Sequence, residues 1–228
     1  MFDVEHRELA RAQSARGEVV LRERRDPDGT GPAVLELRVN GVYVMDTLET
    51  TTERELARAA LAQVEEPRDV LVGGLGLGFT AHEVLADARV ERVAVVEIEE
   101  SLAQWMRDGT VPHGPQYLAD ERLTVVVADV RSAIEEASSG SYDLAVLDVD
   151  NGPEHLGHDT NARVYEVPFL SALREVLRPG GAVAVWSSSE SPVLHQALEE
   201  VFGTAAAEPH DVRLHERDER YWLYVARR

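Results

Sequence analysis

The segment Val70-Leu-Val-Gly-Gly-Leu-Gly-Leu-Gly78 constrains the fold more than any other part of this sequence. Its apolar start, residues 70–72, is typical of a central parallel strand that is covered on both faces. Gly74, Gly76 and Gly78 lack Cβ atoms, so the backbone there can turn sharply and approach a ligand closely. Because residues 79–86 have helical spacing, the loop amides and the helix N-terminus would point at a polar group, usually that of a nucleotide.

The glycine spacing also narrows the class of nucleotide. The dinucleotide fingerprint G-x-G-x-x-G fails because Phe79 stands where its third glycine belongs. A phosphate-binding loop that ends in lysine is excluded because the sequence contains no lysine. G-x-G-x-G after a buried strand resembles motif I of class I S-adenosylmethionine-dependent transferases. A tight strand–helix turn without a ligand is the alternative.

Composition excludes several kinds of chemistry. The absence of cysteine rules out disulfides, thiolate catalysis and cysteine-bound zinc, and the absence of lysine rules out Schiff-base formation. A formal net charge of −19 argues against a nucleic-acid partner and would suit a cationic substrate. No apolar run approaches the roughly 20 residues that span a bilayer, and the N-terminus lacks a signal-peptide pattern, so we expect a cytoplasmic protein without a membrane partner.

The first 50 residues predict a small β-meander appendage. Strands are expected at 17–24, 33–39 and 42–45, with turn residues between them and Asn40-Gly41 as a tight-turn signal. Thr50-Thr-Thr-Glu53 then matches a capping box, which predicts the start of an amphipathic helix. We therefore expect an appendage at 1–50 and a nucleoside-binding catalytic domain at 51–228.

From residue 69 onward the pattern alternates between strand and helix. Strands are predicted at 69–72, 92–97, 123–128, 142–148, 181–187, 211–216 and 220–226. Helices are predicted at 78–87, 99–107, 130–137, 163–177 and 191–202. This order, with short connections, predicts an α/β fold: a doubly wound, mostly parallel seven-stranded sheet with helices on both faces, Rossmann-like in character.

Acidic residues follow the central strands where a ligand would bind. In an open α/β sheet the ligand lies outside the carboxyl ends of the strands. Glu97 ends the second predicted strand, Asp129 follows the third, and Asp148 and Asp150 follow the fourth. Glu97 lies roughly twenty residues after the glycines, where an acidic side chain can accept both ribose hydroxyls. Each carboxylate alone could instead cap a helix, as we consider for Asp129.

These motifs together resemble those of a spermidine synthase-like protein, within the class I methyltransferase fold. The resemblance rests on the glycine segment, Val96-Glu97-Ile98-Glu99, Ala128-Asp129-Val130, the strand that leads to Asp148, and Leu177-Arg-Pro-Gly-Gly181. It implies binding of S-adenosylmethionine or its decarboxylated form as co-substrate. It also implies that Glu97 holds the ribose and Asp129 the adenine amino group, with Ile98 and Val130 in the same site.

The sequence departs from the spermidine synthase pattern at three places. In spermidine synthases the glycine loop resembles G-G-G-D-G-G, and its aspartate holds the donor amine. This chain has Gly76 at the position of that aspartate. Their catalytic segment resembles D-S-[ST]-D-P, and this chain reads Asp148-Val-Asp150-Asn-Gly-Pro153. Val44 and Glu53 replace the expected glutamine and tyrosine. These differences favour methyl over aminopropyl transfer.

Asp148 and Asp150 are the predicted catalytic pair. In an extended segment, residues i and i+2 point the same way, so one carboxylate could orient an amine while the other accepts its proton. An Asx turn at residues 150–152 is the alternative. Asn151, His155 and Tyr165 are expected in the substrate pocket. His155 and His158 lack a third ligand, so no metal is expected.

The leading interpretation is an enzyme that moves an alkyl group, with methyl favoured, from S-adenosylmethionine to a small nucleophile, with an amine favoured. A polyamine aminopropyltransferase that uses decarboxylated S-adenosylmethionine is the first alternative. A catalytically silent nucleoside-binding or scaffold protein is the alternative from another class, and a nicotinamide-dependent oxidoreductase fits the glycine spacing less well. We expect a small-molecule acceptor, with a cationic amine among the candidates. The sequence also leaves open whether the protein forms a homodimer.

Overall fold

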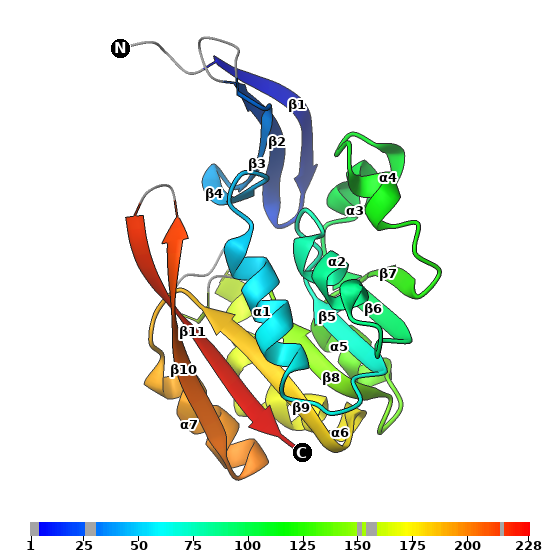
Figure 1. Ribbon diagram of the computed structural model, residues 1–228, viewed down its shortest axis with the longest axis vertical. Coiled ribbons are helices and arrows are strands. Elements are labelled where there is room, and N and C mark those ends of the chain that lie inside the picture. Colours follow the sequence, from blue (N-terminus) through cyan, green and yellow to red (C-terminus); the bar gives the residue numbers. More distant parts are fainter. Residues whose placement is uncertain (1–4, 26–30, 150–151, 154–158, 215–216) are drawn as a thin grey trace.

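The protein contains two β-sheets joined by a helix (Figure 1). The computed structural model describes residues 5–25, 31–149, 152–153, 159–214 and 217–228. The N-terminal sheet is four-stranded and antiparallel, in the order β1-β2-β3-β4. Its strands are β1 (Glu5–Ser14), β2 (Gly17–Arg25), β3 (Val34–Val39) and β4 (Val42–Asp46). Helix α1 (Thr51–Leu61) follows and leads into the second sheet.

The second sheet is seven-stranded, in the order β10-β11-β9-β8-β5-β6-β7. Its strands are β5 (Asp69–Gly73), β6 (Arg92–Glu97), β7 (Leu123–Val127), β8 (Tyr142–Leu147), β9 (Leu177–Ser187), β10 (Ala205–Leu214) and β11 (Arg217–Arg227). Only the β9–β11 and β10–β11 pairings are antiparallel, and the other pairings are parallel. The predicted doubly wound, mostly parallel sheet is confirmed.

Helices cover both faces of this sheet (Figure 1). They are α2 (Phe79–Ala86), α3 (Glu100–Asp108), α4 (Gly114–Tyr117), α5 (Val130–Glu136), the 3-10 helix η1 (Asp159–Tyr165), α6 (Val167–Val176) and α7 (Pro192–Phe202). Alternate residues of β8 belong to different cores: Leu144 and Val146 pack with α1, α2 and α3, and Ala145 and Leu147 pack with α5, α6 and α7. A strand that is buried on both faces explains why its sequence is a continuous apolar run.

The structure has one strand that the sequence did not predict, β1, and β9, β10 and β11 begin earlier than predicted. β1 was not expected, because Glu5–Ser14 is rich in charged residues and helix formers and lacks strand-forming side chains; pairing with β2 overrides this preference. β10 starts at Ala205 instead of 211 and contains Pro209, which reads as a strand breaker. Proline is tolerated there because β10 is an edge strand.

One helix boundary and one helix cap also differ from the prediction. The predicted helix 163–177 is divided, because η1 ends at Tyr165 and α6 begins only at Val167, with Pro168 in its first turn. The predicted capping box at α1 is wrong, because Thr50 makes no side-chain cap. Its hydroxyl oxygen instead accepts a hydrogen bond from Arg54 Nε at 3.0 Å.

The topology fixes where a ligand can bind. The chain runs from β5 outward through β6 to β7 and then returns to the other side of β5 at β8. This reversal opens a crevice at the carboxyl ends of β5, β6 and β8. The N-terminal sheet lies beyond these strand ends (Figure 1), and its Leu37 and Met45 share a core with Leu56 of α1 and Val72 of β5. The two sheets therefore pack as one body around this edge.

Packing of α1 against both sheets predicts a large stability effect at Leu56, whose side chain is 0% exposed. Leu56→Ala should lower the free energy of unfolding by about 2–5 kcal/mol, the usual cost of a buried leucine-to-alanine cavity. Val193→Ala on α7, where the residue is 71% exposed, should change it by less than about 0.5 kcal/mol. Chemical denaturation measures both, and equal effects would contradict the proposed packing of α1.

Candidate active site

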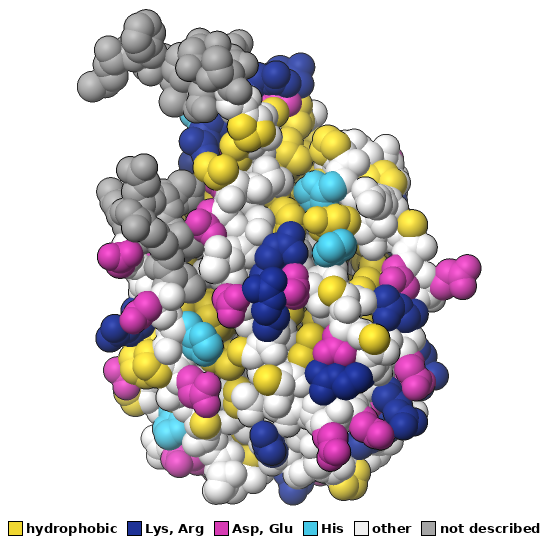
Figure 2. Space-filling model, in the orientation of Figure 1, with side chains coloured by type: hydrophobic (Ala, Val, Ile, Leu, Met, Phe, Trp, Pro, Cys, Tyr) yellow, Lys and Arg dark blue, Asp and Glu magenta, His cyan; other side chains and the backbone are white. Residues whose placement is uncertain are grey.

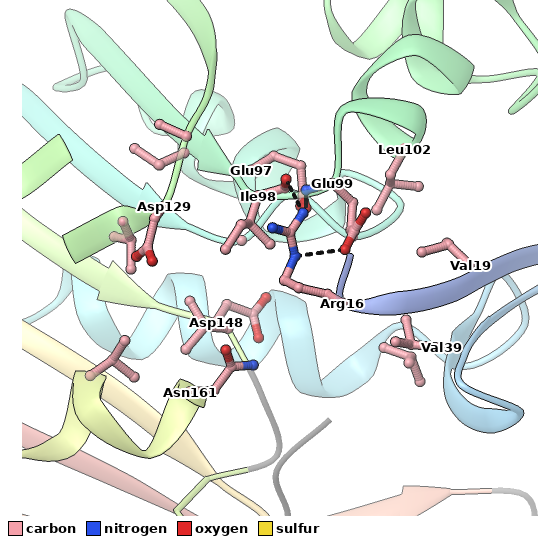
Figure 3. A pocket seen from close by; sticks show the side chains of 18 of the residues that line it. Arg16, Val19, Val39, Glu97, Ile98, Glu99, Leu102, Asp129, Asp148 and Asn161 are labelled. Carbon is pink, nitrogen blue, oxygen red and sulfur yellow. Dashed lines mark hydrogen bonds and ion pairs between the residues drawn. The ribbon is translucent and has the colours of Figure 1, made fainter. Parts of the chain in front are cut away.

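A cavity of about 180 Å³ lies at the predicted edge of the seven-stranded sheet (Figure 3). Strand ends and the loops after β5, β6, β7 and β8 form one side, and β2, β3 and β4 form the other. The lining residues are Arg16, Val19, Leu37, Val39, Val44, Gly74, Gly76, Val96, Glu97, Ile98, Glu99, Leu102, Ala128, Asp129, Val130, Arg131, Asp148, Val149, Asn161 and Val164. Most of the predicted donor-site residues are thus brought together at one cavity.

Two of the three predicted glycines border the cavity with positive φ angles, which glycine adopts readily and other residues rarely do. Gly74 has φ +97°, and a Cβ there would lie 2.1 Å from the carbonyl oxygen of Asp148. Gly76 has φ +50°, and a Cβ there would lie 2.7 Å from Met45 Sδ. Glycine is therefore required at Gly74 by the crossing of the loop over the end of β8, and at Gly76 by close packing on β4.

The third glycine lies at the start of a helix. Gly78 does not line the cavity. It caps α2 in a left-handed conformation with φ +88°, and a Cβ there would lie 2.8 Å from Met106 Cε and 3.2 Å from the ring of Tyr117. The residue faces α3 and α4 on the back of the loop, and its predicted contact with the cofactor stays a prediction.

Glu97 ends β6 and joins two loops. Its side chain is 6% exposed. Oε2 accepts a hydrogen bond from Leu75 N at 2.9 Å, and Oε1 accepts one from Glu99 N at 2.7 Å. Burial raises the pKa of Glu97, and the two backbone donors oppose that rise. A carboxylate held this firmly at the cavity wall can accept further hydrogen bonds from hydroxyl groups of a ligand. Ile98 follows it on the same wall.

Asp129 follows β7 and caps α5, as the alternative interpretation allowed. It accepts a hydrogen bond from Arg131 N at 2.9 Å, and the Arg131 guanidinium donates to both carboxylate oxygens. These hydrogen bonds from Arg131 lower the pKa of Asp129, so the carboxylate is ionised. Asp129 and Val130 both line the cavity, so the cap does not remove the carboxylate from the site.

Asp148 follows β8 and reaches the cavity from the side opposite Glu97 (Figure 3). Its Oδ2 accepts a hydrogen bond from Thr80 Oγ1 at 2.6 Å. Burial raises the pKa of Asp148, and the hydrogen bond from Thr80 opposes that rise. Asp150, Asn151, His155 and His158 lie outside the described residues, so their predicted positions stay predictions.

The region after β8 also holds residues that the sequence placed differently or not at all. Tyr165 was predicted in the substrate pocket, but it is 5% exposed within the core beneath α6 and does not line the cavity. Its neighbours Asn161 and Val164 in η1 do line the cavity. The predicted helix 163–177 is replaced by η1 and α6, and this division decides which side chains face the cavity. No sequence pattern indicated it.

Glu53 is a second, partly buried carboxylate near Asp148. It lies in the first turn of α1, and Thr52 Oγ1 donates to it at 2.8 Å. Burial and the charge of Asp148 raise the pKa of Glu53 to about 7. The pKa of the Tyr221 hydroxyl on β11 is also raised. Burial is the main cause, and the nearby charge of Glu53 contributes. Raised carboxyl pKa values beside a cavity mark a candidate functional site.

The described residues contain no group of three or more His, Cys, Asp or Glu side chains that could hold a metal ion. Within the same ranges, none of the helices has the length and apolar character that crossing a membrane would require.

Comparison with known proteins assigns the family. Residues 49–206 match the spermine/spermidine synthase domain. The chain is 32% identical over 138 residues to putrescine N-methyltransferase 3 of Nicotiana tabacum, covering 60% of this chain and 34% of that protein. It is 32% identical over 167 residues to polyamine aminopropyltransferase 2 of Pseudomonas aeruginosa, covering 69% of this chain and 45% of that protein. The chain thus spans less than half the length of these relatives.

Solved structures of spermidine synthases have the same fold. A spermidine synthase in complex with the transition-state analogue AdoDATO superposes with a TM-score of 0.80 at 17% identity, covering 97% of this chain and 73% of that one. The enzyme from Thermotoga maritima gives a TM-score of 0.79 at 18% identity, covering 97% and 72% of the two chains. The chain belongs to the spermine/spermidine synthase family, a family of transferases, and the resemblance seen in the sequence is confirmed.

The burial of Glu53 predicts a pH-dependent stability difference. The pKa of Glu53 is about 7 in the folded protein, whereas its ordinary value is 4.5. As the pH rises above 4.5, ionisation of Glu53 therefore costs free energy in the folded protein that it does not cost in the unfolded chain. Glu53→Gln removes this cost and should stabilise the ligand-free protein by up to about 3 kcal/mol at pH 8, and by little at pH 4.5.

Urea unfolding at both pH values measures the difference. Glu55→Gln is the matched control, because Glu55 lies two residues further along α1 and its side chain is 38% exposed. Its effect on the free energy of unfolding should not grow between pH 4.5 and pH 8. Equal stabilisation of Glu53→Gln at pH 4.5 and pH 8 would contradict the burial of an ionisable Glu53.

Proposed function

We propose that this chain transfers a methyl group from S-adenosylmethionine to an amine, with the donor nucleoside in the cavity and the acceptor beside Asp148. The observation that carries the proposal is a pair of partly buried carboxylates, Asp148 on the cavity wall and Glu53, whose pKa the charge of Asp148 raises. Among the described residues, no arginine forms an ion pair with either of them. Buried like charges without a counter-ion favour a cationic ligand.

The cavity suits the nucleoside part of the donor. Glu97 offers a fixed carboxylate to ribose hydroxyls, and Asp129 offers one to an amino group of the base. Ile98 and Val130 supply apolar walls for a planar ring. The glycine loop brings backbone close to whatever lies between Gly74 and Gly76. These features support the predicted roles of Glu97, Asp129 and the loop.

Gly76 supports the full donor over the decarboxylated one. The spermidine synthase pattern has an aspartate at this place, which holds the donor amine. Here the loop packs on Met45, whose Sδ lies 2.7 Å from the position of a Cβ and 3.3 Å from Leu77 N. Without a carboxylate at Gly76, nothing there repels the carboxylate of S-adenosylmethionine. The tobacco relative is named for N-methyl transfer to putrescine, a diamine of the class that the acidic end would attract.

The residues of the site would act by positioning and by accepting a proton. When bound, S-adenosylmethionine supplies a methyl carbon bonded to a sulfonium, and the bond to sulfur breaks as the amine nitrogen bonds to that carbon. The amine must present a free electron pair, so its proton goes to a carboxylate. Asp148 suits this role because burial raises its pKa toward that of a useful base. Asp150 is the second candidate from the sequence, and in-line positioning by the cavity supplies the rest.

Product analysis tests the reaction. With S-adenosylmethionine and a panel of amines that includes putrescine, we expect an N-methylated amine and S-adenosylhomocysteine. Asp148→Asn should lower kcat by about 10²-fold or more, with little change in donor affinity, since it removes a proton acceptor and keeps the shape. Asp211→Asn, which changes an exposed carboxylate of β10, is the control and should keep full activity.

Methylthioadenosine as the co-product, formed only with the decarboxylated donor, would instead assign aminopropyl transfer. No turnover with either donor, in a protein that still binds the nucleoside, would assign a silent nucleoside-binding protein.

Competition binding tests the choice of donor independently of turnover. Because Gly76 provides no anion for the donor amine, S-adenosylmethionine should displace methylthioadenosine at least as well as decarboxylated S-adenosylmethionine does. Calorimetric displacement titrations at one ionic strength measure the two affinities. A clear preference for the decarboxylated donor would contradict methyl transfer and would give the amine contact to Asp148.

A further inference from the structure

We propose that His113, which lies behind the glycine loop (residues 74–78), is a positioning residue. Its imidazole donates a hydrogen bond to the carbonyl oxygen of Leu77 and thereby fixes the loop in the orientation that binds the donor. The inference rests on the proposed binding of S-adenosylmethionine in the cavity. It assigns a role to a residue that no sequence motif indicated and that does not itself line the cavity.

Side chains from two separate elements hold the backbone of Leu77. Its carbonyl oxygen accepts a hydrogen bond from His113 Nε2 at 2.8 Å, and its N–H donates to Met45 Sδ of β4 at 3.3 Å. Because a carbonyl oxygen can only accept, Nε2 of His113 carries the proton. Leu77 is 0% exposed, so solvent cannot replace either partner. The course of the loop between β5 and α2 therefore depends on these two side chains.

The hydrogen bonds of the loop amides leave one donor for a ligand. The N–H groups of Gly74, Leu75 and Gly78 donate to protein acceptors at 2.8–2.9 Å. Among the described residues, the N–H of Gly76 has no acceptor, and Gly76 lines the cavity. The trans peptide between Leu75 and Gly76 uses its carbonyl to accept from Gly78 N, so its N–H points away from the turn. The direction of this amide depends on how the loop is held at Leu77, the next residue.

A cluster of rings holds His113 against the loop. The rings of Phe79 and His113 stack with centroids 5.3 Å apart, and the ring of Tyr117 lies 4.8 Å from that of His113. Figure 2 shows histidine side chains beside apolar ones on the surface near α2 and α3. Phe79 begins α2 directly after the loop, and Tyr117 ends α4. The cluster therefore joins the helix that follows the loop to the segment that carries His113.

His82 of α2 belongs to the same cluster but does not hold the loop. Its ring stacks on Tyr117 with centroids 4.0 Å apart. Its Nδ1 is buried, and within the described part of the chain this atom has no hydrogen-bond partner. The two histidines thus share a ring partner and differ in their contact with Leu77. The same substitution at both positions separates the hydrogen bond to the loop from the packing of the rings.

Equilibrium binding of S-adenosylmethionine tests the proposal. His113→Phe keeps an aromatic ring but leaves the buried carbonyl of Leu77 without a donor, so the affinity should fall about 10-fold. His82→Phe is the matched control and should leave the affinity nearly unchanged. His113→Gln should restore most of the lost affinity, because the amide nitrogen of glutamine can donate in place of Nε2.

NMR of the ligand-free protein with ¹⁵N-labelled glycine measures the loop directly. The amide signal of Gly76 should shift in His113→Phe, return toward its wild-type position in His113→Gln, and stay in place in His82→Phe. A change of stability without a change in the loop would leave this signal where it is in the wild-type protein.

Unchanged affinity for S-adenosylmethionine in a folded His113→Phe protein would overturn the proposal. Equal losses in His113→Phe and His82→Phe would also overturn it, because ring packing would then be the cause. If His113→Phe does not fold, ¹⁵N spectra of the wild-type imidazoles decide, since a His113 ring with its proton on Nδ1 alone could not donate to Leu77. Failure of the proposed function is distinct: the wild-type protein would then not bind S-adenosylmethionine, while the Gly76 signal would still respond to His113→Phe.

Discussion

The two hydrogen bonds that the buried carboxylate of Glu97 accepts hold the site together. One comes from Leu75 N in the glycine loop and the other from Glu99 N after β6. Parallel pairing of Gly73 with Val96 brings these loops to the same edge, and Glu97 then joins them. Since the carboxylate is buried, losing either donor would leave a charged oxygen without a partner. The conformation of the glycine loop, the direction of Ile98 and the position of Glu99 opposite Arg16 all depend on this bridge.

The sequence predicted the parts of the site that lie along one strand or at its end. Apolar runs identified the central strands, and parallel strands must end at a common edge, so the positions of Glu97, Asp129 and Asp148 followed. Contacts between distant segments left no comparable pattern. Arg16 lies in the turn of a hairpin that carries no recognisable motif. Its contact with Glu99, 83 positions away in the sequence, places it at the cavity. The spacing of the glycines does not distinguish a glycine that faces a ligand from one that caps a helix, as Gly78 caps α2.

Charge is distributed unevenly along the cavity. Near Glu97, arginines neutralise the acidic wall: Arg16 pairs with Glu99, and Arg131 pairs with Asp129. Near Asp148 and Glu53, the described residues include hydroxyl donors but no arginine partner. A neutral nucleoside suits the first end, where the protein already satisfies its own charges. The second end lacks a positive charge, which a sulfonium centre and an amine would supply together. This difference supports the proposed order, with the nucleoside near Glu97 and the amine near Asp148.

The unpaired carboxylates also connect stability with ligand binding. Burial raises the pKa of Asp148, and burial together with the charge of Asp148 raises the pKa of Glu53, so the ligand-free protein is less stable when both are ionised. A cation placed between them would lower both pKa values and recover that free energy as binding energy. The acidic end would then bind a cationic amine with release of protons, and more strongly above pH 7 than below it, since Glu53 ionises near that pH. Packing alone would favour apolar residues at these two positions. Carboxylates there agree with the proposed binding of a cationic acceptor at this end of the cavity.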